Sequence, residues 1–303
     1  MRFLFNGLSF FGKKLVAELA SFEPRHSFVF YDTYTSRMEQ LKFICSLPFA
    51  DAVISMNGVS DESGSLNAVL AFKKKLLLLW QGTDVLHATQ RAANHTLNKK
   101  YIAYAANYSV APWLKQELNE IGVPNEVLSF SWFGDVTMEK TFKEMSAYTY
   151  IPEGREEFYG WSIVQKLAME NPAIPFYVAG TEGKNLSHPE NVTFLGWLST
   201  ARMQELSVQS PVYLRFTAHD GYPHSVTQAL ACGNEVIWSM PFSHSHLASG
   251  IPEASHAFRK VSDALIQRGL ERNEENIRYA RENFNREKVL AHFLKTLTDV
   301  ATR

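Results

Sequence analysis

Short apolar runs rich in β-formers alternate with stretches of helical period along most of the chain, and this alternation constrains the fold more than any other feature. A short buried strand, a helix and another short strand in succession are typical of the βαβ unit, which builds parallel sheets. The pattern starts afresh at about Ser146, so the sequence predicts two α/β domains. The length of 303 residues agrees, because it exceeds the usual size of a single core.

In the first half, the predicted strands are Arg2–Phe5, Ser27–Tyr31, Asp51–Ser55, Lys75–Trp80, Tyr101–Ala103 and Tyr108–Val110. The predicted helices are Lys13–Ser21 and Pro112–Ile121, the second with a proline in its first turn and Gly122 at its end.

In the second half, the predicted strands are Tyr148–Ile151, Pro175–Ala179, Val192–Phe194, Val212–Phe216 and Val236–Ser239. The predicted helices are Gly160–Glu170, Ala201–Ser207 and Ser225–Ala231, followed by a charged helical stretch from Asn273 to Ala301 with a break near Asn283 and Asn285. We therefore expect an N-terminal domain over 1–140, a C-terminal domain over 146–275 and a helical segment over 276–303. The polar stretch Val136–Ser146 is the expected linker.

The composition is that of an ordinary globular protein, with 46% hydrophobic and 20% charged residues and a formal net charge of −1. This balance predicts no nucleic-acid partner. Cys45 and Cys232 lie in apolar surroundings and are expected to be buried free thiols of a reducing compartment. Neither the N-terminal run nor Leu76–Trp80 is long enough for a signal peptide or a membrane span, which favours a cytoplasmic location.

The turn after the first strand contains Gly7 and Gly12, and the helix that follows offers free backbone amides to an anion. The turn lacks the three spaced glycines of a dinucleotide-binding loop, so NAD binding is not expected. A plain βα turn and a loop that faces a substrate remain the two interpretations.

The segment Gly82-Thr83-Asp84 follows the most apolar strand. A carboxylate at this place could deprotonate an acceptor hydroxyl, and Asp84 is our candidate base. The alternative is that Thr83 or Asp84 caps the next helix. Spacing alone does not separate these two interpretations.

The most informative segment runs from Val212 to Gly233 and is expected to form a strand, a polar loop with Asp220 and Gly221, and a helix. The loop amides and the N-terminus of that helix favour a bound anion. Arg215 at the end of the strand could add charge-assisted contacts to a diphosphate.

This segment resembles the donor-binding signature of glycosyltransferase family 4 and its GT-B relatives. Asp220 and Gly221 stand at the acidic residue and glycine that open the loop, and Asp220 is a candidate catalytic residue. Gln228 stands where the family usually has a glutamate that binds the donor ribose, and Ala229-Leu230-Ala231-Cys232-Gly233 completes the pattern.

Three further pieces precede this segment in the family's order. They are Tyr148–Pro152 with Tyr159-Gly160, Pro175–Gly180, and Asn191–Trp197, which resembles the segment whose backbone contacts the nucleobase and includes Gly196 and Trp197. The family's diphosphate-binding lysine is replaced by Tyr159, and Arg155 is displaced from the position of its arginine. Arg155 or Arg215 is therefore expected to supply the missing cation.

The resemblance implies a GT-B fold, in which two Rossmann-like domains face a cleft and the C-terminal helix packs back toward the N-terminal domain. It implies transfer of a sugar, with retention, from a UDP- or GDP-sugar to a saccharide or lipid-linked acceptor in polysaccharide synthesis. No cofactor and no metal are expected, since His219 and His224 lack clustered partners. A nucleotide-sugar epimerase and a non-catalytic GT-B subunit are the alternatives.

A lipid-linked acceptor would place the protein at the inner face of the membrane. Peripheral contact is then expected through Lys13, Lys14 and Lys73–Lys75, whose charge suits anionic headgroups. Without that role these lysines would form a solvated surface.

Overall fold

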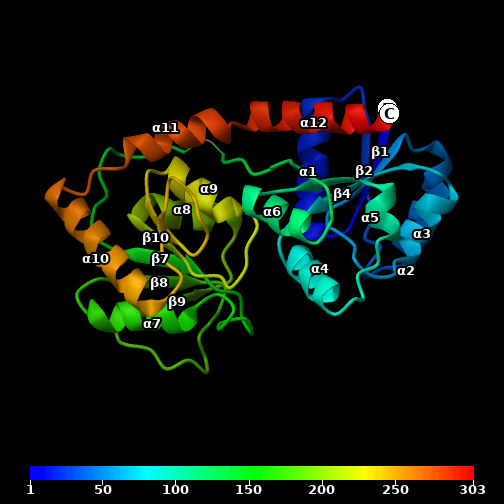
Figure 1. Ribbon diagram of the computed structural model, residues 1–303. Coiled ribbons are helices and arrows are strands. Elements are labelled where there is room, and N and C mark those ends of the chain that lie inside the picture. Colours follow the sequence, from blue (N-terminus) through cyan, green and yellow to red (C-terminus); the bar gives the residue numbers. More distant parts are fainter. Residues whose placement is uncertain (135) are drawn as a thin grey trace. The chain divides into compact units, whose positions relative to one another are not determined.

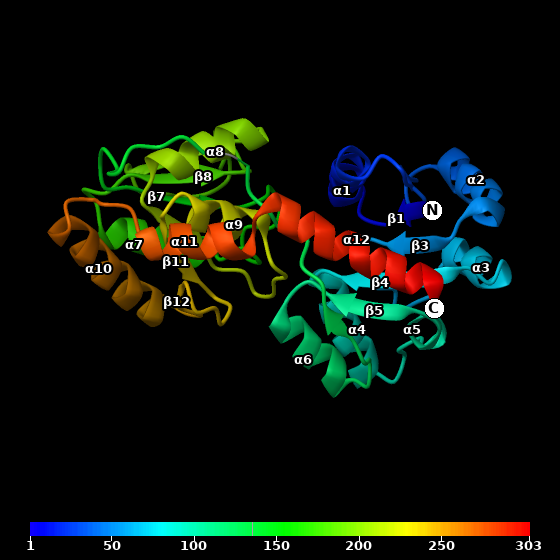
Figure 2. The same ribbon diagram turned by 90° about the horizontal axis from the view of Figure 1, so that it is seen from above.

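The computed structural model describes residues 1–134 and 136–303, which divide into two compact units (Figures 1 and 2). Unit 1 comprises Met1–Ser131 with Arg286–Arg303, and unit 2 comprises Trp132–Asn285. Each unit is built on its own six-stranded sheet, in which every strand pairs parallel to its neighbours. The predicted architecture of two parallel α/β domains is confirmed.

In unit 1 the sheet has the order β2-β1-β3-β4-β5-β6. Its strands are β1 (Arg2–Asn6), β2 (Ser27–Phe30), β3 (Ala52–Ser55), β4 (Lys75–Trp80), β5 (Ala106–Ser109) and β6 (Glu126–Val127). Its helices are α1 (Ser9–Phe22), α2 (Arg37–Ser46), α3 (Gly64–Ala71), α4 (Thr83–Ala93), α5 (Lys100–Tyr104), α6 (Pro112–Glu120) and α12 (Arg286–Thr302), with a 3₁₀ turn at Leu47–Phe49.

In unit 2 the sheet has the order β12-β11-β10-β7-β8-β9. Its strands are β7 (Ala147–Tyr150), β8 (Phe176–Ala179), β9 (Val192–Gly196), β10 (Val212–Arg215), β11 (Glu235–Trp238) and β12 (His246–Leu247). Its helices are α7 (Trp161–Glu170), α8 (Thr200–Gln209), α9 (His224–Ala231), α10 (Ile251–Gln267) and α11 (Glu274–Asn283).

The cores lie between the sheets and the helices that cover them. In unit 1, β4 is buried from Leu76 to Trp80, as a central parallel strand covered on both faces must be. In unit 2, α7 and α10 pack together over one face of the sheet, while α9 packs against α8 and α11 (Figure 1). Within the described ranges, no helix combines the length and apolar character that a membrane crossing demands.

The C-terminal helix α12 belongs to unit 1, where it packs on α1, β3 and β4 (Figures 1 and 2). Its buried side chains include Phe293 and Leu297, and Arg286 Nε donates to Glu18 Oε2 of α1 over 2.6 Å. The expected return of the C-terminal helix to the N-terminal domain is therefore confirmed.

Two local predictions are wrong. Residues 101–103 form part of helix α5 and not a strand, because the Tyr101 hydroxyl is fixed by Asn67 Oδ1 at 2.8 Å and Asn107 Nδ2 holds the carbonyl of Ile102 at 2.9 Å. Cys45 is exposed, since it lies on the outer face of α2, whereas Cys232 is buried and both thiols are free.

The boundary between the two units falls between Ser131 and Trp132. This boundary lies before the linker expected over Val136–Ser146. That stretch lies in unit 2, where Thr141 forms an isolated bridge with Glu271. The 276–303 segment is split between the units, with α11 in unit 2 and α12 in unit 1.

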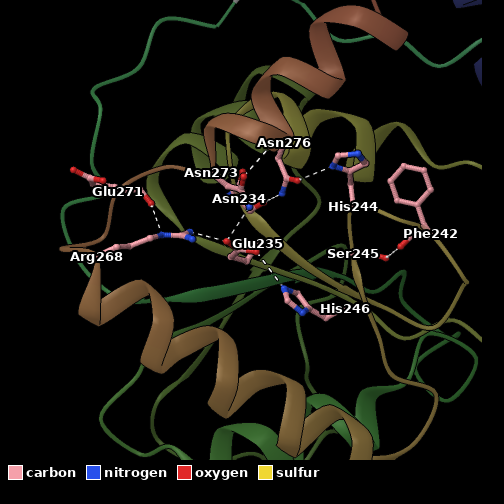
Figure 3. A network of polar contacts seen from close by, with 10 residues as sticks. All are labelled: Asn234, Glu235, Phe242, His244, Ser245, His246, Arg268, Glu271, Asn273 and Asn276. Carbon is pink, nitrogen blue, oxygen red and sulfur yellow. Dashed lines mark hydrogen bonds and ion pairs between the residues drawn. The ribbon is translucent and has the colours of Figure 1, made fainter.

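A polar network around Glu235 joins the first residue of β11 to α10, α11 and β12 (Figure 3). The carboxylate accepts from Arg268 Nη2 at 2.6 Å and Asn273 Nδ2 at 3.1 Å, and it lies 3.2 Å from His246 Nε2. Burial by itself raises the pKa of this carboxyl, but these contacts outweigh burial and lower the pKa to about 2. The network thus fixes the edge of the unit 2 sheet with a buried charge.

Candidate active site

The strand order of unit 2 reverses between β7 and β10, which lie side by side although they are distant in sequence. Open α/β sheets bind ligands outside the carboxyl ends of the strands at such a reversal. The segments that leave these two strands, 151–160 and 216–223, therefore form the candidate active site.

The two segments contact each other through their backbones. The amide of Ala218 donates to the carbonyl of Phe158 over 2.9 Å. Gly160 has a positive φ of +70°, and a Cβ atom at this position would lie 2.4 Å from the carbonyl oxygen of Phe216. Only glycine allows this approach, which brings the start of α7 against the loop after β10.

Arg215 and Asp220 form a buried ion pair at the centre of the site. Arg215 Nε lies 2.7 Å from Asp220 Oδ2, and the Arg215 residue is only 6% exposed. Thr217 Oγ1 donates to the same carboxylate oxygen at 3.1 Å, and the amide of Gly221 donates to the other oxygen at 3.0 Å. Burial opposes the charge of Arg215, but the adjacent carboxylate, together with Tyr213 and Tyr159, outweighs burial and raises the pKa of the guanidinium.

Asp220 therefore binds Arg215 directly. Asp220, a predicted catalytic residue, thus orients the guanidinium of Arg215. A neutral pair of this kind brings no net positive charge to the site, so a diphosphate there needs a further cation.

Tyr159 lies between two guanidinium groups. The Arg215 Cζ atom is 5.0 Å from the centre of the Tyr159 ring, and the Arg155 Cζ atom is 5.7 Å from it. Arg155 also lies 4.4 Å from the centre of the Phe158 ring. Arg155 and Arg215, the two candidates for the missing cation, thus both lie near Tyr159, the residue at the position of the family's lysine.

Gln228 lies one turn into α9, where its Nε2 atom is 3.4 Å from the sulfur of Cys232. Helix α9 begins at His224, and Tyr213 of β10 anchors its first turn by a hydrogen bond of 2.7 Å to Ser225 Oγ. This hydrogen bond holds the first turn of α9 against β10, which brings the positive end of the helix dipole to the loop after β10.

An aromatic row continues the site toward β9. Gly196 ends this strand with a positive φ of +63°, and Trp197, the next residue, is 73% exposed. The Trp197 ring lies 6.4 Å from that of Tyr150 at the end of β7, and the Tyr150 ring lies 6.3 Å from that of Tyr159. A large ring this exposed beside polar groups offers a surface for stacking.

In unit 1 the strand order reverses between β1 and β3. Gly7 follows β1 with a φ of +95°, beside Met56 and Asn57. Gly12 lies inside α1, and a Cβ atom there would meet the Phe30 ring at 2.3 Å, so this glycine serves the packing of the helix on the sheet. Of the two glycines, only Gly7 lies at the carboxyl edge.

Uncharged polar side chains gather at this reversal. Asn6 Nδ2 lies 3.4 Å from Thr33 Oγ1, and Asn57 Nδ2 donates to the hydroxyl of Tyr34 over 2.8 Å. Hydroxyls and amides of this kind recognise other hydroxyl groups without requiring a charge.

Asp84 is held entirely by backbone amides. Its Oδ2 atom accepts from Gly58 at 2.6 Å, and its Oδ1 atom accepts from Gln81, Gly82 and Val85 at 2.8–2.9 Å. Burial raises the pKa of this carboxyl, and the amide hydrogen bonds counteract the rise only in part. Both oxygens are engaged, which favours an anchor between the ends of β3 and β4 over a catalytic base.

Several members of the site were not found from the sequence. Thr217 contacts Asp220, Phe158 lies under Arg155, and Tyr150 links Trp197 to Tyr159. Each of these residues ends or follows one of the two strands, β7 and β10, between which the strand order reverses. That position is the signal that could have identified it. Among the residues that the structure describes, no group of three His, Cys, Asp or Glu side chains could hold a metal ion.

No protein-family model and no curated protein matches the chain. Solved structures do match. The pneumococcal O-GlcNAc transferase GtfA, solved with UDP and GlcNAc, has a TM-score of 0.60 at 14% identity over 86% of this chain. Sucrose-phosphate synthase from Thermosynechococcus elongatus has a TM-score of 0.68 at 10% identity over 99% of both chains.

An α-glucosyltransferase, solved with UDP and a 13-mer DNA that contains an HMU base, has a TM-score of 0.60 at 12% identity over the whole of both chains. This chain spans 59% of the length of GtfA. At such low identity the likeness concerns the fold. Together with the two parallel sheets, it shows that this chain has the GT-B fold of glycosyltransferases.

Proposed function

We propose that the protein transfers a sugar from a nucleoside-diphosphate sugar, with UDP as the first candidate nucleotide, to a saccharide acceptor. The observation that carries this proposal is the grouping of two guanidinium groups, Arg215 oriented by Asp220 and Arg155 beside it, around Tyr159 where the strand order of unit 2 reverses. The GT-B fold supports it, and so do neighbours that were solved with UDP.

In this proposal the diphosphate lies against the N-terminus of α9, with Arg215 and Arg155 beside it. As the bond between the anomeric carbon and the diphosphate oxygen breaks, negative charge grows on that oxygen. The guanidinium groups and helix amides stabilise this charge in the role that a metal ion could otherwise fill. The acceptor oxygen bonds to the anomeric carbon, and its proton passes to the departing phosphate.

Retention at the anomeric carbon is implied by the family resemblance and forms part of the proposal. It needs no protein base, which agrees with the full engagement of Asp84 by amides. The nucleobase is placed on Trp197, next to the backbone of Gly196, because an exposed indole stacks well on a flat base. Gln228 is the proposed ribose ligand.

The acceptor is assigned to the carboxyl edge of unit 1, where Asn6, Asn57 and Tyr34 present uncharged hydrogen-bonding groups beside Gly7. This chemistry suits a saccharide, free or linked to a lipid.

Titration calorimetry with UDP, UDP-sugars and GDP-sugars tests the proposal. Wild type is expected to bind at least one nucleotide sugar, and Arg155→Ala is expected to weaken binding about tenfold, the effect of losing one charge-assisted contact. Arg202→Ala is the matched control, since Arg202 lies in the same unit on α8 and pairs with Glu205 on the surface. Absence of binding by every nucleotide would refute the assignment.

Two other outcomes separate the rival functions. Donor binding without transfer to any acceptor in a saccharide panel would indicate a non-catalytic subunit, which the tyrosine at the lysine position favours. Conversion of the donor to an isomer in the absence of acceptor would indicate an epimerase.

A further inference from the structure

Three segments of unit 1 bring aromatic and basic side chains to the amino-terminal edge of its sheet. Phe49 precedes β3, Phe72 and Lys73 precede β4, which begins at Lys75, and Tyr104 precedes β5. We call Phe49, Phe72, Lys73, Lys75 and Tyr104 the amino-edge patch. It lies at the opposite ends of the strands from the carboxyl edge with Asn6 and Asn57.

Hydrogen bonds hold these segments side by side. Lys74 Nζ donates to the carbonyls of Pro48 and Ala50 at 2.9 and 3.0 Å, which ties the first segment to the second. The Tyr104 hydroxyl donates to the carbonyl of Lys74 at 3.0 Å, which ties the third segment to the second. The patch is therefore a built surface and not a chance meeting of mobile loops.

The rings of the patch face outward instead of filling the core. Phe49 is 70% exposed, and Phe72 and Tyr104 are each 43% exposed. Leu41 and Cys45 are exposed on one face of α2, which ends just before the 3₁₀ turn that carries Phe49. Exposed apolar side chains grouped in this way on a folded protein mark an interaction site.

Basic charge surrounds the rings. Lys73 and Lys75 are exposed, and Lys73 has a φ of +50° at the end of α3, a conformation that usually selects glycine. Among the acidic residues of neighbouring elements, Glu39 is paired with Lys42, Asp51 accepts from the backbone amide of Arg2, and Glu126, on the strand next to β5, is paired with Lys115.

The charge of the whole unit has the same sign. Unit 1 carries 17 basic and 13 acidic residues, a net charge of +4, whereas unit 2 carries 13 basic and 18 acidic residues, a net charge of −5. An acidic partner surface is therefore attracted to unit 1 and repelled by unit 2.

We propose that the amino-edge patch docks unit 1 on an anionic lipid surface. The rings enter the headgroup region, where aromatic side chains are favoured, and the lysines contact anionic headgroups. Docking of this kind goes beyond glycosyl transfer and does not depend on it. Since the patch lies at the far end of the strands, docking leaves the carboxyl edge of unit 1 open.

Co-sedimentation of the full chain tests the proposal, with vesicles of phosphatidylcholine alone and of phosphatidylcholine mixed with phosphatidylglycerol. Wild type is expected to bind the mixed vesicles, and to bind them more weakly at high salt. The double variant Lys73→Gln/Lys75→Gln is expected to lose about tenfold or more in partitioning to mixed vesicles. The double variant Phe49→Ser/Phe72→Ser is expected to lose binding to a similar extent.

Phe10→Ser is the matched control, because Phe10 is an exposed phenylalanine of the same unit, 64% exposed, outside the patch. Circular dichroism and urea titration of each variant show that its fold is intact. The proposal is overturned if wild type ignores anionic vesicles, or if Phe10→Ser loses as much binding as the patch variants. It is also overturned if light scattering shows a dimer that the patch variants dissociate while vesicle binding stays unchanged. UDP binding measured without vesicles tests the proposed nucleotide site separately from membrane docking.

Discussion

The two units share one architecture but stabilise their buried carboxylates in different ways. In unit 1, Asp84 is held only by backbone amides, which cannot move without the strand ends that carry them. In unit 2, Asp220 is paired with Arg215, and Glu235 is paired with Arg268 and His246. An amide cradle fixes local structure, whereas a side-chain cation can respond to a ligand or to pH. From this difference we expect the carboxyl edge of the unit 1 sheet to be rigid, and the charged side chains of unit 2 to change their contacts with a bound ligand or with pH.

The largest effect is expected for Asp84→Ala. The substitution leaves several buried amides of the β3 and β4 ends without an acceptor, so the free energy of unfolding should fall by about 4 kcal/mol. Urea titration followed by circular dichroism measures this, and hydrogen exchange should localise the loss to unit 1. Asp32→Ala is the control, since Asp32 lies near the surface, where water can replace its hydrogen bonds with Thr35 and Tyr34. Equal losses in the two variants would remove the contrast between the units.

A pH-dependent effect is expected for Glu235. Its pKa of about 2 in the folded state lies below the ordinary value of 4.5, so its contribution to stability is present above pH 4.5 and is lost as the pH falls toward 2. Across this window, wild type should lose about 3 kcal/mol relative to Glu235→Gln. Urea titrations of both proteins at several pH values check this. If the free energies of unfolding of the two proteins changed with pH in parallel, the ion pairs of Glu235 would not contribute to the stability of unit 2 at low pH.

The smallest effect is expected at the aromatic row of unit 2. Trp197→Ala should weaken UDP binding about tenfold, because one stacking surface for the base is lost. Phe10→Ala in unit 1, which removes a similarly exposed ring, should leave UDP affinity unchanged. Calorimetry measures the UDP affinity of both variants. Equal losses of affinity would contradict a nucleotide site in unit 2.

The sequence was sufficient to predict the two parallel sheets, because most of their strands are short apolar runs bounded by turns. It failed at Tyr101, since two consecutive buried residues, Tyr101 and Ile102, imitate a strand although side-chain hydrogen bonds hold a helical turn there. It also failed at Cys45, because this thiol is exposed like Met38 and Leu41 of the same helix, whereas Phe43 is the buried apolar side chain of α2.

At the candidate site, the sequence located the strand ends but not the pairings between side chains. Arg215 and Asp220 are five residues apart, and their contact depends on the path of the loop after β10. The choice between base and cap at Asp84 likewise required the position of Gly58, which comes from a different strand end. Contacts of this kind between loops carry no periodic signal in the sequence.

The membership of α12 in unit 1 has a consequence for synthesis on the ribosome. Unit 2 is one continuous stretch of chain, whereas unit 1 needs Arg286–Arg303 to cover Phe130 and the helix α1. Those residues emerge after the whole of unit 2. Unit 2 can therefore complete its fold before unit 1, although N-terminal domains generally fold first during synthesis. Until α12 is synthesised, the hydrophobic face of unit 1 that this helix covers stays exposed.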